Sequence, residues 1–344
     1  MSILIDENTR LIIQGATGRE GSFHTERMLE YGARVTGGVT PGKGGQSVCS
    51  VPVFDTVREA VETAGADASV LFVPARFMLE SVKEAIDADI PLIVTIAEHV
   101  PAHDAMLCFH LAKAKGARLI GPNSFGVISP GKSKAGFMDH NLFTPGPVGI
   151  MSRSATNCYE TAHMLTRRGI GQSTCVGIGG DMIPGSSFAD LLPDFENDPQ
   201  TRAIVIIGEI GGGGEEAAAA YIKRHVTKPV VALIVGKNAP RGAVMGHAGA
   251  IAETNVYAAG SAAVGRTAAV GAASGETATV DAATVDAASG GAATVGAAAG
   301  KTAAGEPLRG KGGAKGKEDA LRAAGCRIAE SAAHIAEILS EMLG

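Results

Sequence analysis

The sequence predicts an α/β protein with two parallel sheets, and three observations lead to this prediction. Short runs rich in Val and Ile alternate with amphipathic stretches as far as about residue 237. These runs are almost continuously apolar, as strands are when helices cover both faces of a parallel sheet. The Pro- and Gly-rich stretch 144-TPGPVG-149 interrupts the alternation and predicts a boundary between two α/β domains. A chain of 344 residues is long enough for two such domains, each with its own core.

The expected elements follow from local patterns, taken in chain order. Strands are predicted for residues 10–14, 69–74, 91–96, 117–122, 148–152, 174–179, 203–208 and 229–236. Amphipathic helices are predicted at 77–88 and 102–116, and another helix follows residue 21. Residues 318–344 regain helical periodicity, and we expect them to dock on the second domain.

Residues 252–317 break this alternation, because they consist mostly of Ala, Gly, Thr and Val. Few large apolar side chains are available there to offset the entropy of ordering the backbone. We therefore expect a flexible, dispensable insertion, and an oligomer contact is the alternative. The predicted domains are 1–145, then 146–251 together with 318–344, with 252–317 as the insertion.

Composition argues against several classes of function. The net charge is −5 and the basic residues are scattered, so we expect no nucleic-acid partner and no membrane association. The five cysteines include no CxxC pair, which indicates a reducing compartment and no metal site. The first ten residues, MSILIDENTR, show no targeting pattern, so a cytoplasmic location is expected.

A glycine-rich turn, 15-GATGREG-21, follows the first predicted strand and opens a helix. Glycines allow a sharp turn, and the free N–H groups of a helix N-terminus bind phosphate. The next strand-like run, 34-RVTGGVTPGKGG-45, has no acidic residue for ribose hydroxyls and offers Lys43. A lysine suits a ribose that carries a phosphate. NADP and coenzyme A (CoA) both fit this description.

His247 lies in the stretch 245-MGHAGAI-251, where its neighbours are very small. Small residues allow another surface to approach the ring, or the loop to move. Neutral imidazole is a nucleophile near pH 7, so this position is a candidate for covalent catalysis.

Four motifs in this order and spacing closely resemble the family of succinyl-CoA synthetase α subunits. They are 36-TGGVTPGKGG-45, 173-STCVGIGGD-181, 208-GEIGG-212 and 245-MGHAGAI-251. The resemblance implies a Rossmann-like CoA-binding domain followed by a flavodoxin-like domain. It also implies an acid–CoA ligase that works through a phosphohistidine. In this family a β subunit with an ATP-grasp fold holds ATP or GTP with Mg, in an αβ or α2β2 assembly.

Site residues carried over from the resemblance fall into three groups. The catalytic residues would be His247, which is phosphorylated, and Glu209, which orients it. The CoA-binding residues would be Thr17, Gly18, Arg19, Glu20, Lys43, Ile96, Ala97 and Glu98. The residues that bind the acid or its phosphate would be Asn123, Ser124, Phe125, Ser154, Ala155 and Tyr159.

Two stretches depart from the family pattern. The family run G-P-N-C-P-G is replaced within 121-GPNSFGVISPG-131, and S-R-S-G-T-L-T-Y-E becomes 152-SRSATNCYE-160. Phe125 adds bulk and Asn157 adds an amide, and changes of this kind can alter which acid a pocket accepts. Two alternatives stay open: the chain selects another dicarboxylic acid, or it retains succinate.

Two other functions compete with the ligase. One is an NADP-dependent oxidoreductase that uses Lys43, which leaves the Glu209 and His247 motifs unexplained. The other is a CoA-sensing or partner-scaffolding relative that has lost turnover.

Overall fold

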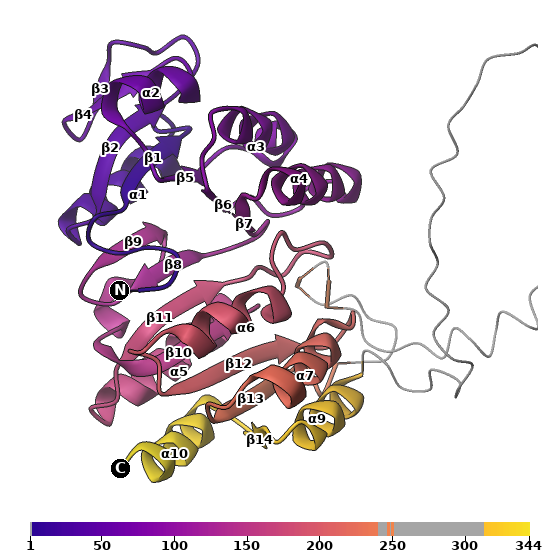
Figure 1. Cartoon of the computed structure of the whole chain (residues 1–344). Coiled ribbons are helices and arrows are strands. Elements are labelled where there is room, and N and C mark those ends of the chain that lie inside the picture. Colours follow the sequence, from indigo (N-terminus) through magenta and orange to yellow (C-terminus); the bar gives the residue numbers. More distant parts are fainter. Residues whose placement is uncertain (1, 240–245, 248, 251–312) are drawn as a thin grey trace, which may run out of the picture. The chain divides into compact units, whose positions relative to one another are not determined.

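The computed structural model describes residues 2–239, 246–247, 249–250 and 313–344. These residues form two sheets, each with helices packed against it (Figure 1). None of the described helices is both long and apolar enough to cross a membrane. The two parallel-rich sheets confirm the predicted fold class.

The first sheet has the strand order of a Rossmann fold. Its strands are β1 (Arg10–Gln14), β2 (Arg34–Val39), β3 (Ser47–Val48), β4 (Val51–Phe54), β5 (Ala68–Leu71), β6 (Leu92–Thr95) and β7 (Arg118–Ile120). They lie in the order β3-β4-β2-β1-β5-β6-β7, and every neighbouring pair is parallel except β3 with β4. Without β3, the parallel strands follow the doubly wound order 3-2-1-4-5-6. The strand order reverses beside β1, where folds of this kind bind ligands at the carboxyl ends of the strands.

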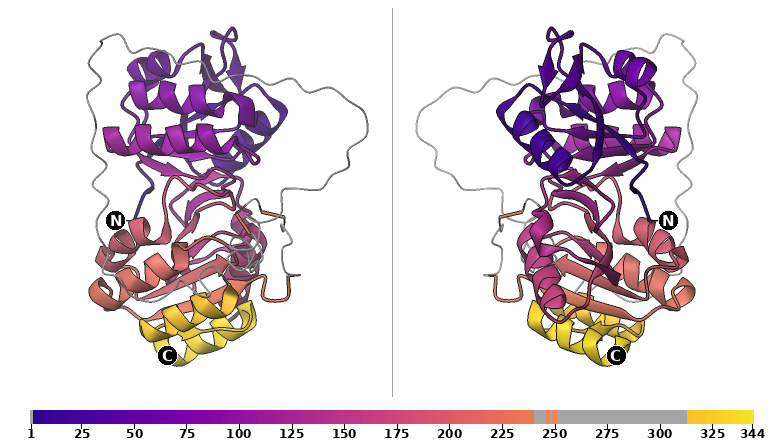
Figure 2. Two further views of the ribbon diagram at one scale, coloured as in Figure 1. Left: turned by 90° about the vertical axis from the view of Figure 1, so that its right-hand side faces the viewer. Right: turned by 90° about the vertical axis from the view of Figure 1, so that its left-hand side faces the viewer.

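Helices cover both faces of this sheet (Figure 2). Helix α1 (Arg19–Glu30) buries Met28 on one face. The short helix η1 (Ala75–Phe77) leads into α3, and the other face is covered by α2 (Val57–Ala64), α3 (Met78–Asp87) and α4 (Ala102–Lys115). Because both faces are buried, the central strands β1, β5 and β6 are largely apolar, as the sequence pattern predicts.

The second sheet has the order of a flavodoxin-like fold. Its strands are β8 (Gly126–Ser129), β9 (Ser133–Gly136), β10 (Pro145–Ser152), β11 (Gln172–Gly177), β12 (Ala203–Glu209), β13 (Val230–Val235) and β14 (Arg327–Ile328). They lie in the order β14-β13-β12-β10-β11-β8-β9. The parallel strands β10 to β14 therefore follow the order 2-1-3-4-5, read from the β11 side. Strand β8 pairs antiparallel with β11 at this edge.

Two helix layers cover the second sheet. Helices α5 (Ala155–Arg167) and α10 (Ala332–Leu343) pack on one face, with the short helix η2 (His140–Leu142) beside α5. Helices α6 (Phe188–Asn197), α7 (Gly214–His225) and α9 (Ala314–Ala323) pack on the other (Figure 1).

The chain changes sheet earlier than the boundary predicted between residues 145 and 146. Strands β8 and β9 precede that boundary and belong to the second sheet. Gly126 allows this close pairing, because a Cβ there would lie 2.3 Å from the carbonyl oxygen of Ala135. The Pro- and Gly-rich stretch marks the start of β10 within the second sheet.

The C-terminal prediction needs one correction. The predicted insertion ends too late, because α9 begins at Ala314 and already contains the buried Lys317. Residues 318–344 comprise the rest of α9, β14 and α10, and Gly325 with φ +89° lies between α9 and β14. Helix α9 packs against α7, and composition alone does not reveal such a tertiary contact. The remaining part of the predicted insertion, 252–312, lies outside the described residues.

Candidate active site

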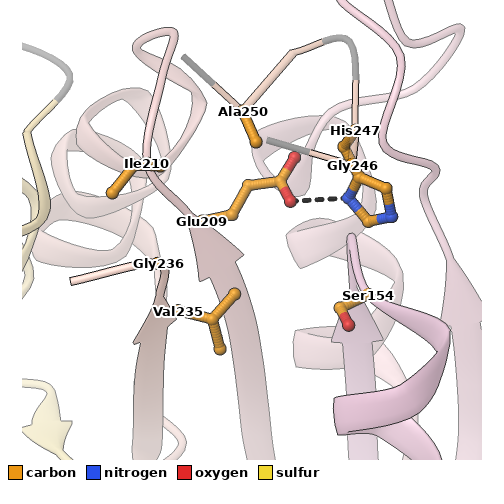
Figure 3. Close-up of a pocket in the computed structure, with 8 residues that line it drawn as sticks. All are labelled: Ser154, Glu209, Ile210, Val235, Gly236, Gly246, His247 and Ala250. Carbon is orange, nitrogen blue, oxygen red and sulfur yellow. Dashed lines mark hydrogen bonds and ion pairs between the residues drawn. The ribbon is translucent and has the colours of Figure 1, made fainter. Parts of the chain in front are cut away.

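The end of β12 carries the acidic partner of the predicted nucleophile. Glu209 is the last residue of this strand, and its side chain is only 4% exposed. Its Oε2 lies 2.7 Å from Nδ1 of His247 (Figure 3). Because an ionised carboxylate only accepts hydrogen bonds, we assign the proton to Nδ1 and the free lone pair to Nε2. The imidazole therefore presents Nε2 as its nucleophilic nitrogen.

Arg153 holds the other oxygen of the same carboxylate. Its Nε lies 3.0 Å from Oε1 of Glu209, and its Nη2 donates to the carbonyl oxygen of Asp181 at 3.0 Å. The Arg153 side chain is 8% exposed, so this is a buried ion pair. Arg153 received no role from the sequence, although it stands in 152-SRSATNCYE-160. Charged residues are rarely buried without a partner, so a buried Glu209 indicates that an Arg or Lys pairs with it. This reasoning is the sequence-level signal for Arg153.

Glycines around His247 allow close packing of the ring and its loop. A Cβ on Gly180 would lie 2.3 Å from Cγ of His247, and one on Gly249 would lie 2.6 Å from Nη2 of Arg153. The N–H of Gly249 donates to the carbonyl oxygen of Gly180 at 3.0 Å. Close approach thus requires glycine at positions 180 and 249 in this conformation. That the loop also moves stays a prediction.

Helix α5 begins beside the imidazole. Ser154 is its N-cap, and Ser154 Oγ accepts from the backbone N–H of Asn157 at 3.4 Å and from its Nδ2 at 2.9 Å. The family's leucine position is therefore occupied by an amide that holds Ser154. Other N–H groups in a first helical turn lack intrahelical acceptors, which makes this end suitable for a phosphate.

Ser154, Glu209 and His247 line a cavity of about 220 Å³ (Figure 3). The lining residues are Ser154, Glu209, Ile210, Val235, Gly236, Gly246, His247 and Ala250. Predicted site residues from three separate sequence motifs, Ser154, Glu209 and His247, thus meet in one place.

The pKa of His247 is raised above its ordinary value of 6.5. The main cause is the hydrogen bond to Glu209, whereas burial and the charge of Arg153 lower the pKa. Burial raises the pKa of the Asp181 carboxyl, although the hydrogen bond from Asn123 opposes this. Since neutral imidazole is the nucleophile, the reactive form of His247 increases as the pH rises through its raised pKa.

Two of the predicted acid-binding residues lie in the core. Ser124 and Phe125 are each 2% exposed. Ser124 Oγ donates to the carbonyl oxygen of Gly177 at 2.6 Å and accepts from the N–H of Gly126 at 2.9 Å. The Phe125 ring lies against Gly177, where a Cβ would be 2.8 Å away. Neither side chain lines the cavity at His247, so the bulk of Phe125 fills the core at this position.

The other three predicted acid-binding residues occupy different places. Asn123 precedes the Ser124 turn and contacts Asp181, next to Gly180. Ala155 is the first residue of α5 and is half-buried. The ring of Tyr159 lies 5.8 Å from that of Phe125, and its buried hydroxyl has no hydrogen-bond partner among the described residues. Their roles in binding stay predictions.

The predicted phosphate loop connects β1 to α1. Gly15 has φ +77°, and a Cβ there would lie 2.5 Å from the carbonyl oxygen of Phe72. The N-cap, Gly18, makes no side-chain capping hydrogen bond, so the first N–H groups of α1 remain available to a ligand. Thr17 is half-buried, whereas Gly18, Arg19 and Glu20 are exposed.

The other predicted CoA-binding residues also follow carboxyl ends of strands in the first sheet. Lys43 is exposed in the turn after β2, between Gly42 and Gly45, which have φ values of +75° and +82°. Ile96, Ala97 and Glu98 follow β6 directly, and Glu98 is exposed. The structure therefore places all three segments at the same edge of the sheet.

A chain of contacts joins this edge to the histidine. The carbonyl oxygen of Ala97 accepts from the backbone N–H of Asn123 at 2.8 Å. Asn123 contacts Asp181, and the neighbouring Gly180 lies against the His247 ring. The two predicted sites are thus parts of one continuous region.

Comparison with known proteins gives two family matches. A model described as CoA binding domain matches residues 6–99, and one described as CoA-ligase matches residues 151–271.

Curated relatives match along most of their length. The alpha 2 subunit of the ADP-forming succinate–CoA ligase from Archaeoglobus fulgidus is 54% identical, over 76% of this chain and 91% of that protein. The corresponding alpha subunit from Methanothermobacter thermautotrophicus is 52% identical, over 75% of this chain and 88% of its own. The one from Staphylococcus aureus is 50% identical, over 73% and 83% respectively.

Solved structures share the fold at lower identity. ATP citrate lyase from Methanothrix soehngenii, in complex with citrate and coenzyme A, has a TM-score of 0.76 at 23% identity. That match covers 99% of this chain but only 51% of the lyase chain. The dinucleotide-forming acetyl-coenzyme A synthetase 1 from Candidatus Korarchaeum cryptofilum has a TM-score of 0.59 at 21% identity, over 74% of this chain and 56% of that chain.

The identity of 50% or more to three alpha subunits, over at least 73% of this chain, confirms the resemblance seen in the motifs. The chain therefore belongs to the family of succinate–CoA ligase alpha subunits.

Proposed function

We propose that this chain is the α subunit of an ADP- or GDP-forming acid–CoA ligase in which His247 carries the phosphoryl group. The observation that carries the proposal is the 2.7 Å contact between Nδ1 of His247 and Glu209, which places the lone pair of the neutral ring on Nε2. The buried ion pair between Glu209 and Arg153 supports it, because Arg153 lies against the second oxygen of the carboxylate that contacts the ring.

The reaction follows in three balanced steps. First, Nε2 of His247 forms a bond to the terminal phosphorus of the nucleotide, and the bond to the departing diphosphate breaks. Second, an oxygen of the substrate carboxylate attacks that phosphorus, the N–P bond breaks, and an acyl phosphate forms. Third, the CoA sulfur attacks the acyl carbon, the bond between that carbon and the phosphate oxygen breaks, and the departing phosphate takes up the thiol proton. The net products are the thioester, the nucleoside diphosphate and phosphate.

The described residues contribute two kinds of assistance to the first two steps. Glu209 keeps the proton on Nδ1 and stabilises the positive charge that develops on the ring while the N–P bond forms. The N-terminus of α5 at Ser154 offers N–H groups to the phosphoryl oxygens without adding bulk.

For the thiol substrate, we propose CoA, bound along the carboxyl edge of the first sheet. The loop at Gly15–Gly21 would hold its diphosphate, and Lys43 would contact the phosphate on its ribose. Phosphate binding in such loops relies on backbone N–H groups, so the exposed Arg19 is compatible with this role.

An alpha subunit of a two-subunit ligase requires a β partner. We propose that this partner has an ATP-grasp fold and supplies ATP or GTP with Mg, in an αβ or α2β2 complex. The acid is succinate, as the names of the relatives indicate, or a related dicarboxylic acid.

The deciding experiment is labelling of the complex with a nucleoside triphosphate that is radioactive in its terminal phosphate. We expect label that is lost in acid and retained in base, and that is absent from His247→Asn. Addition of succinate and CoA should release the label and produce succinyl-CoA. Label without thioester formation from any acid of a dicarboxylate panel would favour the relative that has lost turnover. Tight NADP binding without CoA binding would favour the oxidoreductase.

A further inference from the structure

A buried ion pair lies behind Glu209, outside the cavity. Lys317 on α9 and Glu215 in the first turn of α7 both have side chains that are 0% exposed. The Nζ of Lys317 donates to Oε2 of Glu215, and a second carboxylate, that of Glu216, lies 3.6 Å from the same Nζ. Burying such charges is costly, and an apolar pair of similar volume is often as stable. The pair therefore calls for an explanation other than stability.

The second oxygen of Glu215 contacts the strand that carries Glu209. Its Oε1 accepts from the backbone N–H of Glu209 at 3.1 Å. Gly208 leaves room for this contact, because a Cβ there would lie 2.6 Å from Cγ and Oε1 of Glu215. The glutamate therefore lies directly over the end of β12.

Glu209 is thus held at three points. Its backbone N–H donates to Glu215, its Oε2 is hydrogen-bonded to His247, and its Oε1 forms an ion pair with Arg153. The last two contacts set the direction of the carboxylate, whereas the first sets the position of the backbone from which it extends. Small displacements of catalytic groups slow reactions strongly, so the backbone contact affects how well Glu209 orients the imidazole.

We propose that Glu215 and Lys317 are positioning residues for Glu209. Glu215 fixes the end of β12 through the N–H of Glu209, and Lys317 orients Glu215 and balances its charge. Helix α9, which follows residues 251–312 in the chain, is thereby connected to the catalytic strand. The consequence for phosphoryl transfer rests on the proposed function. The effect on the orientation of His247 does not.

Two double variants remove both charges of the Glu215–Lys317 pair. Comparing them distinguishes a positioning role of Glu215 from a role in filling buried space. In Glu215→Gln with Lys317→Met, the amide oxygen still accepts from the N–H of Glu209. In Glu215→Leu with Lys317→Met, a side chain of similar size offers no acceptor. The control is Lys315→Met, because Lys315 lies on the same helix and its side chain is 87% exposed.

The first measurement is an NMR titration of the histidine rings in the full chain, with His247→Asn to assign the signal. The other charged groups that face His247, Arg153 and Asp181, are unchanged in all variants. We expect the His247 pKa to fall toward its ordinary value in the leucine variant and to stay closer to the native value in the glutamine variant. The control should titrate like the native chain.

The second measurement is the rate of His247 labelling in the complex with the β subunit. We expect the leucine variant to be slower than the glutamine variant by about tenfold or more, with equal CoA affinity. If the leucine variant does not fold, Glu215→Met with Lys317→Met takes its place, because methionine adapts to irregular space.

Two outcomes would overturn the proposal. One is an identical His247 titration in the leucine and glutamine variants. The other is equal labelling rates in these variants when the native complex labels normally. If the native complex does not label at all, the proposed function fails, and the titration still decides the role of Glu215 and Lys317.

Discussion

Replacing Arg153 by methionine tests the electrostatics of the site most directly. Arg153 and Glu209 have side chains that are 8% and 4% exposed, with 3.0 Å between Nε and Oε1. Removing one member of a buried ion pair costs about 3–5 kcal/mol, because the remaining charge stays buried. His247 still contacts Oε2 in this variant, so we expect the lower end, about 3 kcal/mol. Urea denaturation of the native and variant chains measures this difference.

The same substitution should move the pH dependence of phosphorylation. The charge of Arg153 lowers the pKa of His247, so its removal raises that pKa further. Because neutral imidazole is reactive, the pH at which labelling is half-maximal should move upward. The control is Arg168→Met, whose partner Glu337 lies 3.6 Å away and is 59% exposed; such pairs contribute less than about 1 kcal/mol. A loss of stability equal to that of the control, together with an unchanged pH midpoint, would refute the assigned role of Arg153.

Three further predictions concern other parts of the site. Glu209→Gln removes the main cause of the raised His247 pKa, so the pH midpoint of labelling should move downward while the maximal rate falls. The stabilising effect of the native pair is present below pH 6.5 and is lost as the pH rises through the raised pKa, so this variant should lose more stability at low pH than at high pH. Lys43→Ala should weaken CoA binding by about 1–3 kcal/mol in calorimetry. Dephospho-CoA should be affected much less, and an equal loss would place the lysine elsewhere. Phe125→Ala should destabilise the chain by about 3–5 kcal/mol, because the ring is 2% exposed and fills the core. A stable Phe125→Ala variant with a changed preference among dicarboxylic acids would instead place Phe125 in the acid site.

The amino-acid sequence by itself determined the α/β class, the principal strands and the motifs of the site. The apolar runs that became β10 to β13 are local patterns, and a buried parallel strand requires such a pattern whatever surrounds it. Gly15 and His247 were recognisable for the same reason, since the residues that mark them are their immediate neighbours in the chain.

Only the tertiary structure decided which residues complete the site. Arg153 meets Glu209, and Lys317 meets Glu215, across long separations in the chain, so no periodicity or spacing signals these pairs. The hairpin β8–β9 belongs to the second sheet because β8 pairs with β11. The Phe125 ring lies in the core because Gly177 leaves space for it. Local patterns determine which segments form strands and helices, whereas packing between distant segments decides which side chains become buried, paired or available for chemistry.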